Sequence, residues 1–566
     1  MMPVLGLLMD PNLIHENAVF RAAYEMVGFE TSRGFLILVG VAALSTVVVT
    51  NTAVALTMWL AHRFAWKVQA RLSGELLGRY VSMPFEEFLT RNTAELRRNI
   101  LTEATRLTIG VMIPLMNLIV FGVTVVFLIG FLVWLNPVFA GLAVVVLGGG
   151  YLLIFLAVRR AMARSGTARL QAEAAKFKLV GEALEGAREI RVLGRGQTLL
   201  RRFAAPTRVH ASTIASHQVL SQVPRYAIEA FAFGSVLVAV LYFLGSGSPL
   251  RTLIPVVGVY AFAGFRLLPA IQSMYHAWAS VRFNQASLAP IQNDLGTPIF
   301  QKPLASSSHQ TGRAAFKTEI RLEKVSFKYR GARDQTLDEI TLTIPRGSFV
   351  ALVGETGSGK STIAEIILGL LPPHTGVLSV DGAPLETGEQ LRKWQNGIGY
   401  VPQDIYLSND TVEANIAFGV EKEKIDRRAV EQAARIARIH DFVVEQLPNG
   451  FDTALGDTGV RVSGGQRQRI GIARALYHDP DVLVLDEATS DLDVDTEAQV
   501  HQAILEAART KTVIMVAHRL DTTRHCDILF HIDRGRLVAQ GRFPDVVGAD
   551  GRLLATSGGH GQPIRR

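Results

Sequence analysis

The sequence predicts an α-helical, polytopic membrane domain followed by a soluble α/β domain. Three observations support this fold class. The first half of the chain contains long runs without Lys, Arg, Asp or Glu. A stretch rich in Pro, Ser and Gly at 296–318 then interrupts the pattern and predicts a linker. Beyond it, short apolar strands alternate with amphipathic helices, as they do in α/β domains.

The composition agrees with this division. The chain has 566 residues, of which 49% are hydrophobic, and this share exceeds that of a typical soluble enzyme. The formal net charge of +8 does not call for nucleic acid, because the basic residues gather between the apolar runs. We therefore expect no nucleic-acid partner. Cys526 is the single cysteine, so an intrachain disulfide is excluded.

The charge-free runs define the membrane spans. A helix needs about 20 apolar residues to cross a hydrocarbon core of about 30 Å. The run 107–158 is long enough for two crossings, and we place the turn at Asn136-Pro137, because Pro breaks helices and Asn-Pro favours turns. Within a transmembrane domain of residues 1–295, the predicted full spans lie near 35–61, 109–135, 138–158, 229–246 and 252–272.

Basic residues orient these spans. Eight Lys or Arg lie between Arg63 and Arg106, and twelve lie between Arg159 and Arg208. By the positive-inside rule, these two connections are cytoplasmic. They also contain long helical stretches, so we expect the spans to continue into the cytoplasm. The predicted location is the cytoplasmic membrane, with the α/β domain in the cytoplasm.

The N-terminal residues are too short for a crossing. Residues 2–9 would reach about 12 Å as a helix. Because the orientation places 10–33 outside, we expect this fragment to be the external end of a first span truncated at Met1, through start-site misassignment or genuine shortening. Residues 12–29 predict a short amphipathic helix, either at the external interface or packed on protein.

Two arginines are candidate cavity residues. Arg266 lies fourteen residues into the last span, about 21 Å along a helix, where it could snorkel or face a water-filled path. Arg225 stands at the cytoplasmic entrance of the preceding span, where Glu229 one turn away is an alternative partner. Guanidinium groups suit bidentate phosphate recognition, so both could line a cavity for a pyrophosphate-linked or anionic lipid.

The soluble half, 319–548 with a tail of 549–566, contains a phosphate-binding turn. Apolar SFVALV precedes GETGSGKST, and a helix-forming segment follows. Such a turn lets backbone N–H groups surround phosphates at a helix N-terminus. We expect Lys360 to meet the β- and γ-phosphates and Ser361 to ligate Mg²⁺. The candidate ATP-binding residues here are Gly354, Glu355, Thr356, Gly357, Ser358, Gly359, Lys360, Ser361 and Thr362.

Two carboxylates follow a second apolar strand. In VLVLDEATS, Asp486 would hold Mg²⁺ and Glu487 would orient or deprotonate the attacking water. The alternative, a solvated acidic turn, does not explain the four apolar residues that would carry the pair toward the nucleotide loop.

These motifs, with others in order, resemble an ATP-binding cassette from about Glu319 to Val547. The motifs are Tyr329, GETGSGKST, Gln403 in YVPQD, VSGGQ, VLVLDE, SDLD and His518 in VAHRL.

The resemblance implies a role for each motif. Tyr329 would stack on adenine, Gln403 would sense Mg²⁺ and contact the membrane domain, and His518 would act with Lys360 and Glu487 at the γ-phosphate. A signature of Ser463, Gly464, Gly465 and Gln466 would close over nucleotide held by the opposite subunit, beside Asp493 of the D-loop. ATP and Mg²⁺ are the implied cofactors, and a dimer, expected to be a homodimer, completes each site.

Two positions depart from the family pattern. Val462 replaces the usual Leu of the signature, and Asp491 replaces Ala in SALD. Neither removes a catalytic group, so we expect two competent sites, although Asp491 could alter coupling between the subunits.

Over its whole length the chain resembles a half-transporter of the ABC exporter type, with the type IV fold. Two shorter stretches, VPRYAIEAF and FRLLPAIQSMYH, are similar to flippases of lipid-linked oligosaccharides. The implied function is ATP-driven flipping of such a glycolipid by alternating access, with membrane lipids as further partners. Multidrug or lipid A-type export is the alternative, followed by a membrane-anchored signalling or scaffold ATPase.

Overall fold

The computed structural model divides into two compact units, which we describe separately: residues 1–81 with 91–299, and residues 82–90 with 300–566. The structure describes residues 21, 24, 25, 32–135, 137, 141, 148–245, 250–296, 312–314, 316–386, 388–456, 460, 462–487, 494–517, 519–548 and 552–554. Most of the predicted N-terminal segment 2–29 and most of the linker 296–318 therefore lie outside the described residues.

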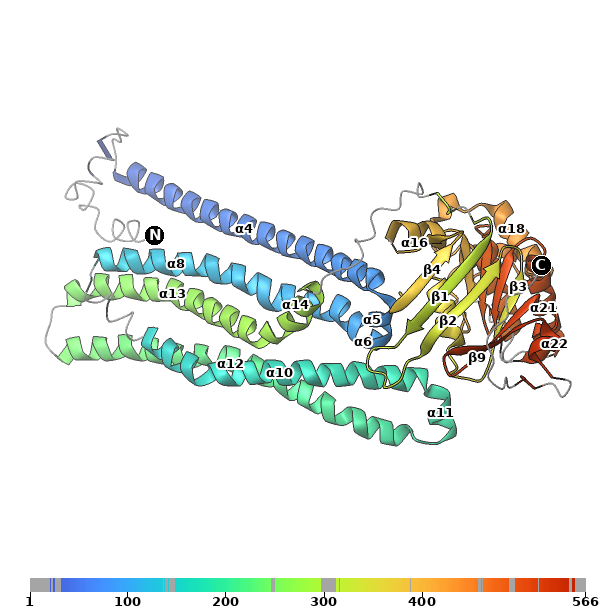
Figure 1. Cartoon of the computed structure of the whole chain (residues 1–566). Helices are drawn as coiled ribbons and strands as arrows, with labels where there is room; N and C mark the ends of the chain where they lie inside the picture. The colour runs from blue at the N-terminus through green and yellow to red at the C-terminus, as the bar shows by residue number, and fades with distance from the viewer. Residues whose placement is uncertain are drawn as a thin grey trace. The chain divides into compact units, whose positions relative to one another are not determined.

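The first unit consists of long helices (Figure 1). Helix α10 packs against α12, and α8 packs against α13, which also contacts α10 and α12. Shorter helices α11 (Ala187–Val192) and α14 (Leu288–Gly296) accompany them. The long helices are α4 (Ser32–Ser82), α8 (Ile113–Leu135), α10 (Gly149–Glu185), α12 (Gly196–Gly245) and α13 (Leu250–Asn284).

Helix α8 continues a helical stretch that begins at α6 (Thr93–Arg98). The side chain of Asn92 caps α6 by accepting a hydrogen bond from the Ala94 amide at 2.9 Å. Two π-helical turns, η1 (Asn99–Glu103) and η2 (Thr108–Met112), flank α7 (Ala104–Leu107) before α8 begins. The helix thus extends well beyond the predicted span 109–135.

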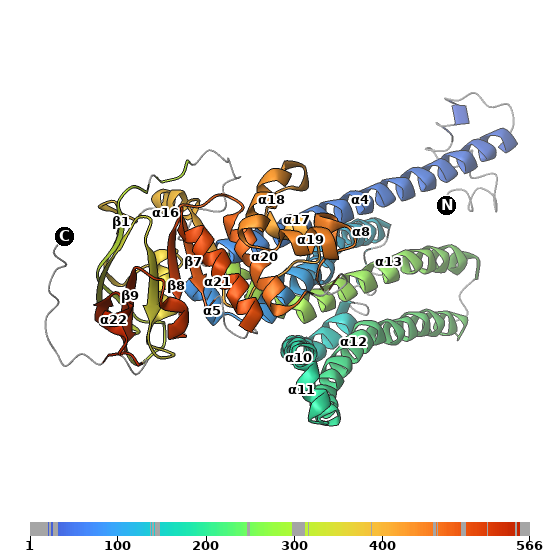
Figure 2. The same cartoon turned by 90° about the vertical axis from the view of Figure 1, so that its right-hand side faces the viewer.

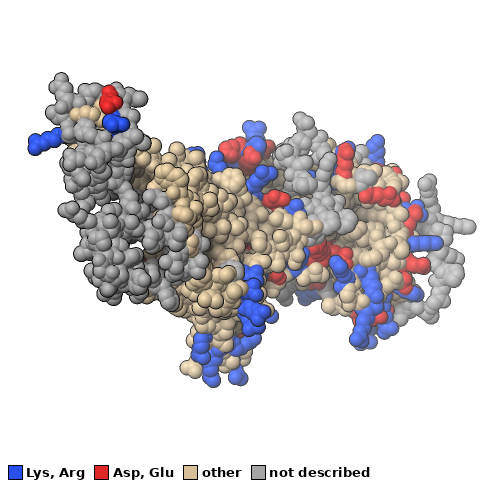
Figure 3. Space-filling view, turned by 90° about the vertical axis from the view of Figure 1, so that its left-hand side faces the viewer, with Lys and Arg blue, Asp and Glu red and all other residues tan. Residues whose placement is uncertain are grey.

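Two helical stretches among the described residues have the length and composition to cross a membrane, Arg33–Ser82 and Thr93–Trp134. In the most apolar 18 residues of each stretch, only 6% and 11% of the residues, respectively, are buried. Figure 3 accordingly shows a broad area of the surface without charged side chains. Within α4, the hydroxyls of Thr46, Thr50 and Thr57 donate to carbonyls four residues earlier, at 2.7 to 2.8 Å, so their polar groups are satisfied inside the helix.

The remaining predicted spans fall on helices or on residues that are not described. The span 252–272 lies within α13, and the span 229–246 occupies the end of α12, which stops at Gly245. Helix α10 begins at Gly149, and most of the preceding residues of the predicted span 138–158 lie outside the described residues.

Buried ionic groups pair at the predicted cytoplasmic ends of the helices. The carboxylate of Asp294, on α14, accepts a hydrogen bond from the side-chain amide of Asn99 at 2.9 Å and forms an ion pair with Arg91 at 3.0 Å. Arg169, 1% exposed, donates to Ser287 at 2.8 Å and pairs with Glu173 at 3.5 Å. Asp294 with Asn99 and Arg91, and Arg169 with Ser287, join residues far apart in sequence, whereas Arg169 and Glu173 lie one turn apart on α10. Each charge is paired because a buried charge is costly without a partner.

The second unit contains two β-sheets. A sheet in the order β2-β1-β4-β5 is antiparallel, and a sheet in the order β10-β9-β3-β8-β7-β6 is parallel except at β10. The strands are β1 (Glu319–Phe327), β2 (Leu337–Pro345), β3 (Phe349–Val353), β4 (Thr375–Val380), β5 (Ala383–Pro384), β6 (Ile398–Val401), β7 (Val482–Asp486), β8 (Thr512–Val516), β9 (Ile528–Asp533) and β10 (Arg536–Gly541).

Helices surround these sheets, and α17, α18, α19 and α20 form one group (Figure 2). Segment 82–90 contributes α5 (Phe85–Thr90) to this unit. The other helices are α15 (Lys360–Ile367), α16 (Gly388–Gln395), α17 (Val412–Ile416), α18 (Arg427–Ile436), α19 (His440–Gln446), α20 (Gly464–Leu476), α21 (Val494–Ala508) and α22 (Phe543–Val546).

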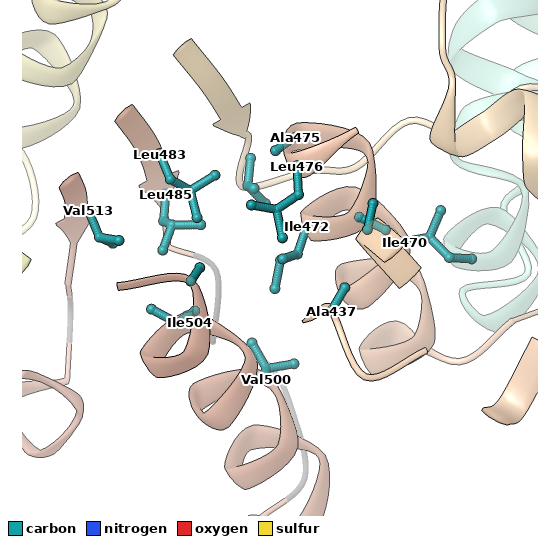
Figure 4. Packing of buried hydrophobic residues seen from close by; sticks show 14 of the residues in the cluster. Ala437, Ile470, Ile472, Ala475, Leu476, Leu483, Leu485, Val500, Ile504 and Val513 are labelled. Carbon is teal, nitrogen blue, oxygen red and sulfur yellow. The ribbon is translucent and has the colours of Figure 1, made fainter. Parts of the chain in front are cut away.

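Strand β3 is buried on both faces and separates two hydrophobic cores. Val350 and Leu352 belong to the core that includes α15, whereas Ala351 and Val353 belong to the core that includes α20 and α21. Figure 4 shows the second core, with Leu483 and Leu485 of β7 facing the side chains of α20 and α21. The carboxyl ends of β3, β7 and β6 are thereby fixed along one edge of the parallel sheet.

A matched pair of glycines in α10 tests the packing of the helical unit. A Cβ at Gly166 would lie 2.1 Å from the Phe283 carbonyl oxygen, whereas a Cβ at Gly181 would meet nothing within 4 Å. We expect Gly166→Ala to destabilise the unit by about 1–3 kcal/mol through overpacking, and Gly181→Ala to stabilise it by up to about 1 kcal/mol. Thermal unfolding in detergent measures both, and equal midpoints for the two variants would contradict this packing.

Candidate nucleotide-binding site

The glycine-rich turn connects the end of β3 to the start of α15. Gly354, Gly357 and Gly359 have φ of +149°, +81° and +105°, which favour glycine. A Cβ at Gly354 would lie 2.0 Å from the carbonyl oxygen of Ile532, and a Cβ at Gly359 would lie 2.6 Å from Leu337. The tight turn therefore depends on glycine for both its backbone conformation and its packing.

Lys360 is held inside this turn. Lys360 is 4% exposed, and its ammonium donates to the carbonyl oxygens of Gly354 and Glu355, both at 2.8 Å. Burial lowers the pKa of Lys360, and the carboxylates of Glu487 and Asp486 oppose that shift. The cation is thus placed where phosphate oxygens could replace the two carbonyls.

The turn also contains a buried hydroxyl that points to a ligand. Ser358 is 4% exposed, and its hydroxyl oxygen has no hydrogen-bond partner among the residues that the structure describes. Buried polar groups in native proteins are nearly always paired. An orphaned donor beside the glycine turn and Lys360 fits the phosphates of a nucleotide.

The candidate magnesium ligands lie beside this turn. The Ser361 hydroxyl is 3.4 Å from Asp486 Oδ1, at the end of β7. Among the described residues there is no group of three His, Cys, Asp or Glu side chains that could hold a metal alone. The residues present, a serine hydroxyl and a carboxylate, fit Mg²⁺ that shares its coordination with phosphate oxygens.

Glu487 has an unusual backbone conformation. Its φ is +50°, which is uncommon for a residue other than glycine, and its amide donates to the Val516 carbonyl at 3.2 Å. Its carboxylate accepts a hydrogen bond from the Gln403 amide at 2.8 Å. Gln403 follows β6 and Glu487 follows β7, and these neighbouring parallel strands bring the two side chains together.

Tyr329 is anchored at its hydroxyl. The hydroxyl donates to Glu365 Oε2 at 2.8 Å and lies 3.2 Å from the Thr362 hydroxyl. Its ring also makes an edge contact with Phe327, at 5.0 Å between centroids. Burial raises the pKa of Tyr329 to about 12, so the hydroxyl keeps its proton at neutral pH.

The signature segment starts helix α20. The Ser463 hydroxyl accepts a hydrogen bond from the backbone amide of Gln466 at 3.2 Å. The side-chain oxygen of Gln466 accepts one from the backbone amide of Ser463 at 2.8 Å, and the two bonds form a capping box. Ser463 and Gly464 are exposed, Gly465 is buried, and Val462 packs against the core as an apolar substitute would. The exposed N-terminus of this helix is suited to an anion.

Several predicted residues cannot be placed in the site. Asp491, Asp493 and His518 lie outside the described residues. Arg266 is located on α13, but its side chain is not described. Arg225 Nε lies 2.7 Å from Glu229 Oε1, so the alternative ion pair that the sequence left open is present.

Two contacts near Tyr329 were not foreseen. Glu365 is the only charged residue in the apolar segment that follows the glycine-rich turn, and this isolation is a signal that the sequence offered. Glu86 of α5 accepts a hydrogen bond from the Arg330 amide at 3.1 Å, and Phe85 packs against the same core as Tyr329. No local pattern indicates this second contact.

Comparison with known families agrees with this site. The profile described as ABC transporter matches residues 337–490, and the profile described as ABC transporter transmembrane region matches residues 4–249.

Individual relatives extend the similarity. An ATP-dependent lipid A-core flippase from Albidiferax ferrireducens is 30% identical over 513 residues, covering 89% of this chain and 84% of that protein. One from Vibrio cholerae is 40% identical over 233 residues, covering 41% of this chain and 40% of that protein. The solved structure of a bacterial Atm1-family ABC exporter with ATP bound matches with a TM-score of 0.72 and 23% identity, over 97% of this chain and 95% of that one. This likeness confirms the predicted fold class.

A glycine substitution tests the phosphate-binding turn. Gly359→Ala would force a Cβ against Leu337 at a φ of +105°, and we expect the dissociation constant for ATP to rise at least about tenfold. Gly382→Ala is the matched control, because Gly382 has a φ of +77° and a Cβ there would meet nothing within 4 Å. Fluorescent-nucleotide titration measures both variants, and similar affinities would show that the turn does not depend on Gly359.

Proposed function

The chain belongs to the ABC transporter family as an ATP-driven exporter, and from this premise we propose that it flips an anionic glycolipid across the cytoplasmic membrane. The observation that supports this proposal best is the similarity along 84% of a relative named for flipping lipid A-core. The described nucleotide turn supplies a site for the driving reaction.

The site residues support separate roles in ATP hydrolysis. We assign phosphate binding to the turn with Lys360, and magnesium binding to Ser361 and Asp486, assisted by Gln403. When bound, Mg²⁺ would neutralise charge on the phosphates. Glu487 would orient the attacking water and accept its proton, and Tyr329 would stack on the base. Asp493 and His518 keep the roles that the family resemblance implies.

The contact between Gln403 and Glu487 bears on these roles. One carboxylate oxygen of Glu487, Oε2, accepts from the Gln403 side-chain amide at 2.8 Å, so Gln403 competes with the attacking water for this proposed base. In the proposed cycle, closure of the site with nucleotide breaks the hydrogen bond between Gln403 and Glu487. Gln403 would then be available to assist Mg²⁺ binding, and Glu487 Oε2 would be available to water.

The exposed signature supports dimerisation. Ser463 and Gly464 stand exposed at the N-terminus of α20, where they could close over nucleotide bound to a second chain. We propose a homodimer, in which two identical chains complete two ATP sites and alternate the access of one membrane cavity.

The cargo has two candidate classes within anionic glycolipids. The names of the relatives favour lipid A-core. A lipid-linked oligosaccharide is the second candidate, because Arg225 and Arg266 could bind a pyrophosphate. The ion pair with Glu229 leaves the Arg225 side chain 50% exposed, so the pair does not by itself prevent contact with a lipid headgroup.

Replacing the proposed base tests the catalytic assignment. Glu487→Gln keeps the size of the side chain and removes its basicity, so we expect ATP binding to persist while turnover falls by at least about 10²-fold. Phosphate release and nucleotide binding are measured on the same detergent-purified protein. Substantial residual hydrolysis would place the base elsewhere.

Reconstitution tests the cargo. In proteoliposomes we compare lipid A-core, a polyprenyl-pyrophosphate oligosaccharide, a neutral phospholipid and a hydrophobic dye, and record flipping together with hydrolysis. We expect an anionic glycolipid to be flipped and to stimulate hydrolysis. Flipping of the dye alone would favour multidrug export, and hydrolysis indifferent to every lipid would favour the scaffold alternative.

The arginines separate the two glycolipid classes. If pyrophosphate is the recognised group, Arg225→Ala with Arg266→Ala should slow flipping of the oligosaccharide lipid by at least about tenfold, while basal hydrolysis persists. Lys178→Ala is the matched control, because Lys178 also pairs with a glutamate one turn away, Glu182 at 3.9 Å. Unchanged flipping in the double variant would exclude recognition by these two residues.

A further inference from the structure

Glu365 has a half-buried carboxylate to which the proposed mechanism of ATP hydrolysis assigns no role. It lies on α15 among Ile363, Ala364, Ile366 and Ile367, each of which is at most 1% exposed. Burial raises the pKa of Glu365, and the nearby Asp486 carboxylate adds to that shift, whereas the hydrogen bond from Tyr329 opposes it. An acidic group kept in such surroundings carries a desolvation cost that a specific partner must offset.

That partner is the Tyr329 hydroxyl. The 2.8 Å contact from the hydroxyl to Glu365 Oε2 joins residues 36 positions apart, and hydrogen bonds to carboxylates are stronger than those between neutral groups. With its proton directed to the carboxylate, the Tyr329 oxygen can accept from Thr362, which lies 3.2 Å away. The end of the ring is thus attached to α15 through two side chains.

The other parts of Tyr329 are also restrained. Phe327 contacts the ring nearly perpendicularly, with an interplanar angle of 87°. The following residue, Arg330, is attached through its backbone amide to Glu86 of α5 at 3.1 Å. With the hydroxyl fixed to α15 and the backbone fixed to α5, the ring cannot swing freely about its Cα–Cβ bond.

The two anchors on α15 follow Lys360 directly in the same helix. Lys360 begins α15, Thr362 is two residues later and Glu365 is five residues later. One short helix therefore fixes both the phosphate-binding cation and the orientation of the ring proposed to stack on the base. Fixing a contact surface before the ligand arrives lowers the entropy cost of binding.

We propose that Glu365 is a positioning residue for ATP, which holds the Tyr329 ring in the orientation that receives the adenine base. The inference rests on the proposed role of Tyr329 and adds a residue that acts through it. Glu365 does not touch the reacting phosphates, so its removal should change the apparent affinity for ATP and spare the chemical step.

A double-mutant cycle on the full-length protein tests this role. Tyr329→Phe and Glu365→Ala each remove one side of the same hydrogen bond, so each should raise the KM for ATP about three- to tenfold. The kcat of each variant should stay within about twofold of the parent. The KM of the double variant should be no higher than that of the single variant with the higher KM, because the effects of two substitutions at one shared contact do not add. Multiplying effects on KM would overturn the proposal.

Three further variants separate positioning from stability. Glu365→Gln keeps an oxygen that can accept the Tyr329 proton and should restore most of the affinity lost in Glu365→Ala. Glu389→Ala, which removes an exposed carboxylate on α16 that pairs with Lys393, should leave KM unchanged. A Glu365→Ala protein with a lower unfolding midpoint and an unchanged KM would assign Glu365 to folding alone.

Removing the whole ring distinguishes this inference from the proposed function. Tyr329→Ala should raise the KM for ATP by more than Tyr329→Phe, and in that background Glu365→Ala should have no further effect. If Tyr329→Ala leaves KM unchanged, the base-stacking role itself is wrong. If Tyr329→Ala raises KM but Glu365→Ala does not, only the positioning role fails.

Discussion

The tight turn between β3 and α15 is the constraint on which the nucleotide site depends. The backbone passes so close to Ile532 and Leu337 that side chains at Gly354 and Gly359 would collide with them. The same turn buries Lys360 and leaves the Ser358 hydroxyl without a partner among the described residues. The polypeptide thus holds a cation and an unpaired donor at the start of a helix, directly after β3, which is buried on both faces.

In the helical unit, by contrast, polar groups within the apolar helices are paired inside the helices themselves. A helix forms its backbone hydrogen bonds within itself. In α4 three threonine hydroxyls also donate to backbone carbonyls of the same helix. Charged side chains gather instead at the predicted cytoplasmic ends, where Arg169 pairs with Glu173 and Asp294 pairs with Arg91. The first pair lies within α10, and the second joins α14 to the segment before α6. Both are costly to break, because removing one partner leaves a buried charge.

Contacts around the nucleotide site link its parts to one another. Glu86 belongs to the connection between α4 and α6, yet it accepts from the backbone next to Tyr329. Gln403 follows β6, yet its amide occupies the carboxylate of Glu487. Each contact joins a residue proposed to act on nucleotide, or its neighbour in the chain, to a segment that is distant in sequence.

The sequence by itself determined the order of the two domains, the phosphate-binding turn, the two carboxylates at the end of β7 and the apolar helices. Each of these follows from a local pattern of glycines, charges or hydrophobic runs. It raised the pairing of Arg225 with Glu229 as an alternative, since both residues lie one turn apart on α12. Only the tertiary structure decided that Gln403 meets Glu487, that Glu487 adopts a positive φ, and that Glu365 holds Tyr329. These partners lie 36 or 84 residues apart, and their meeting depends on strand order and helix packing, which no local pattern specifies.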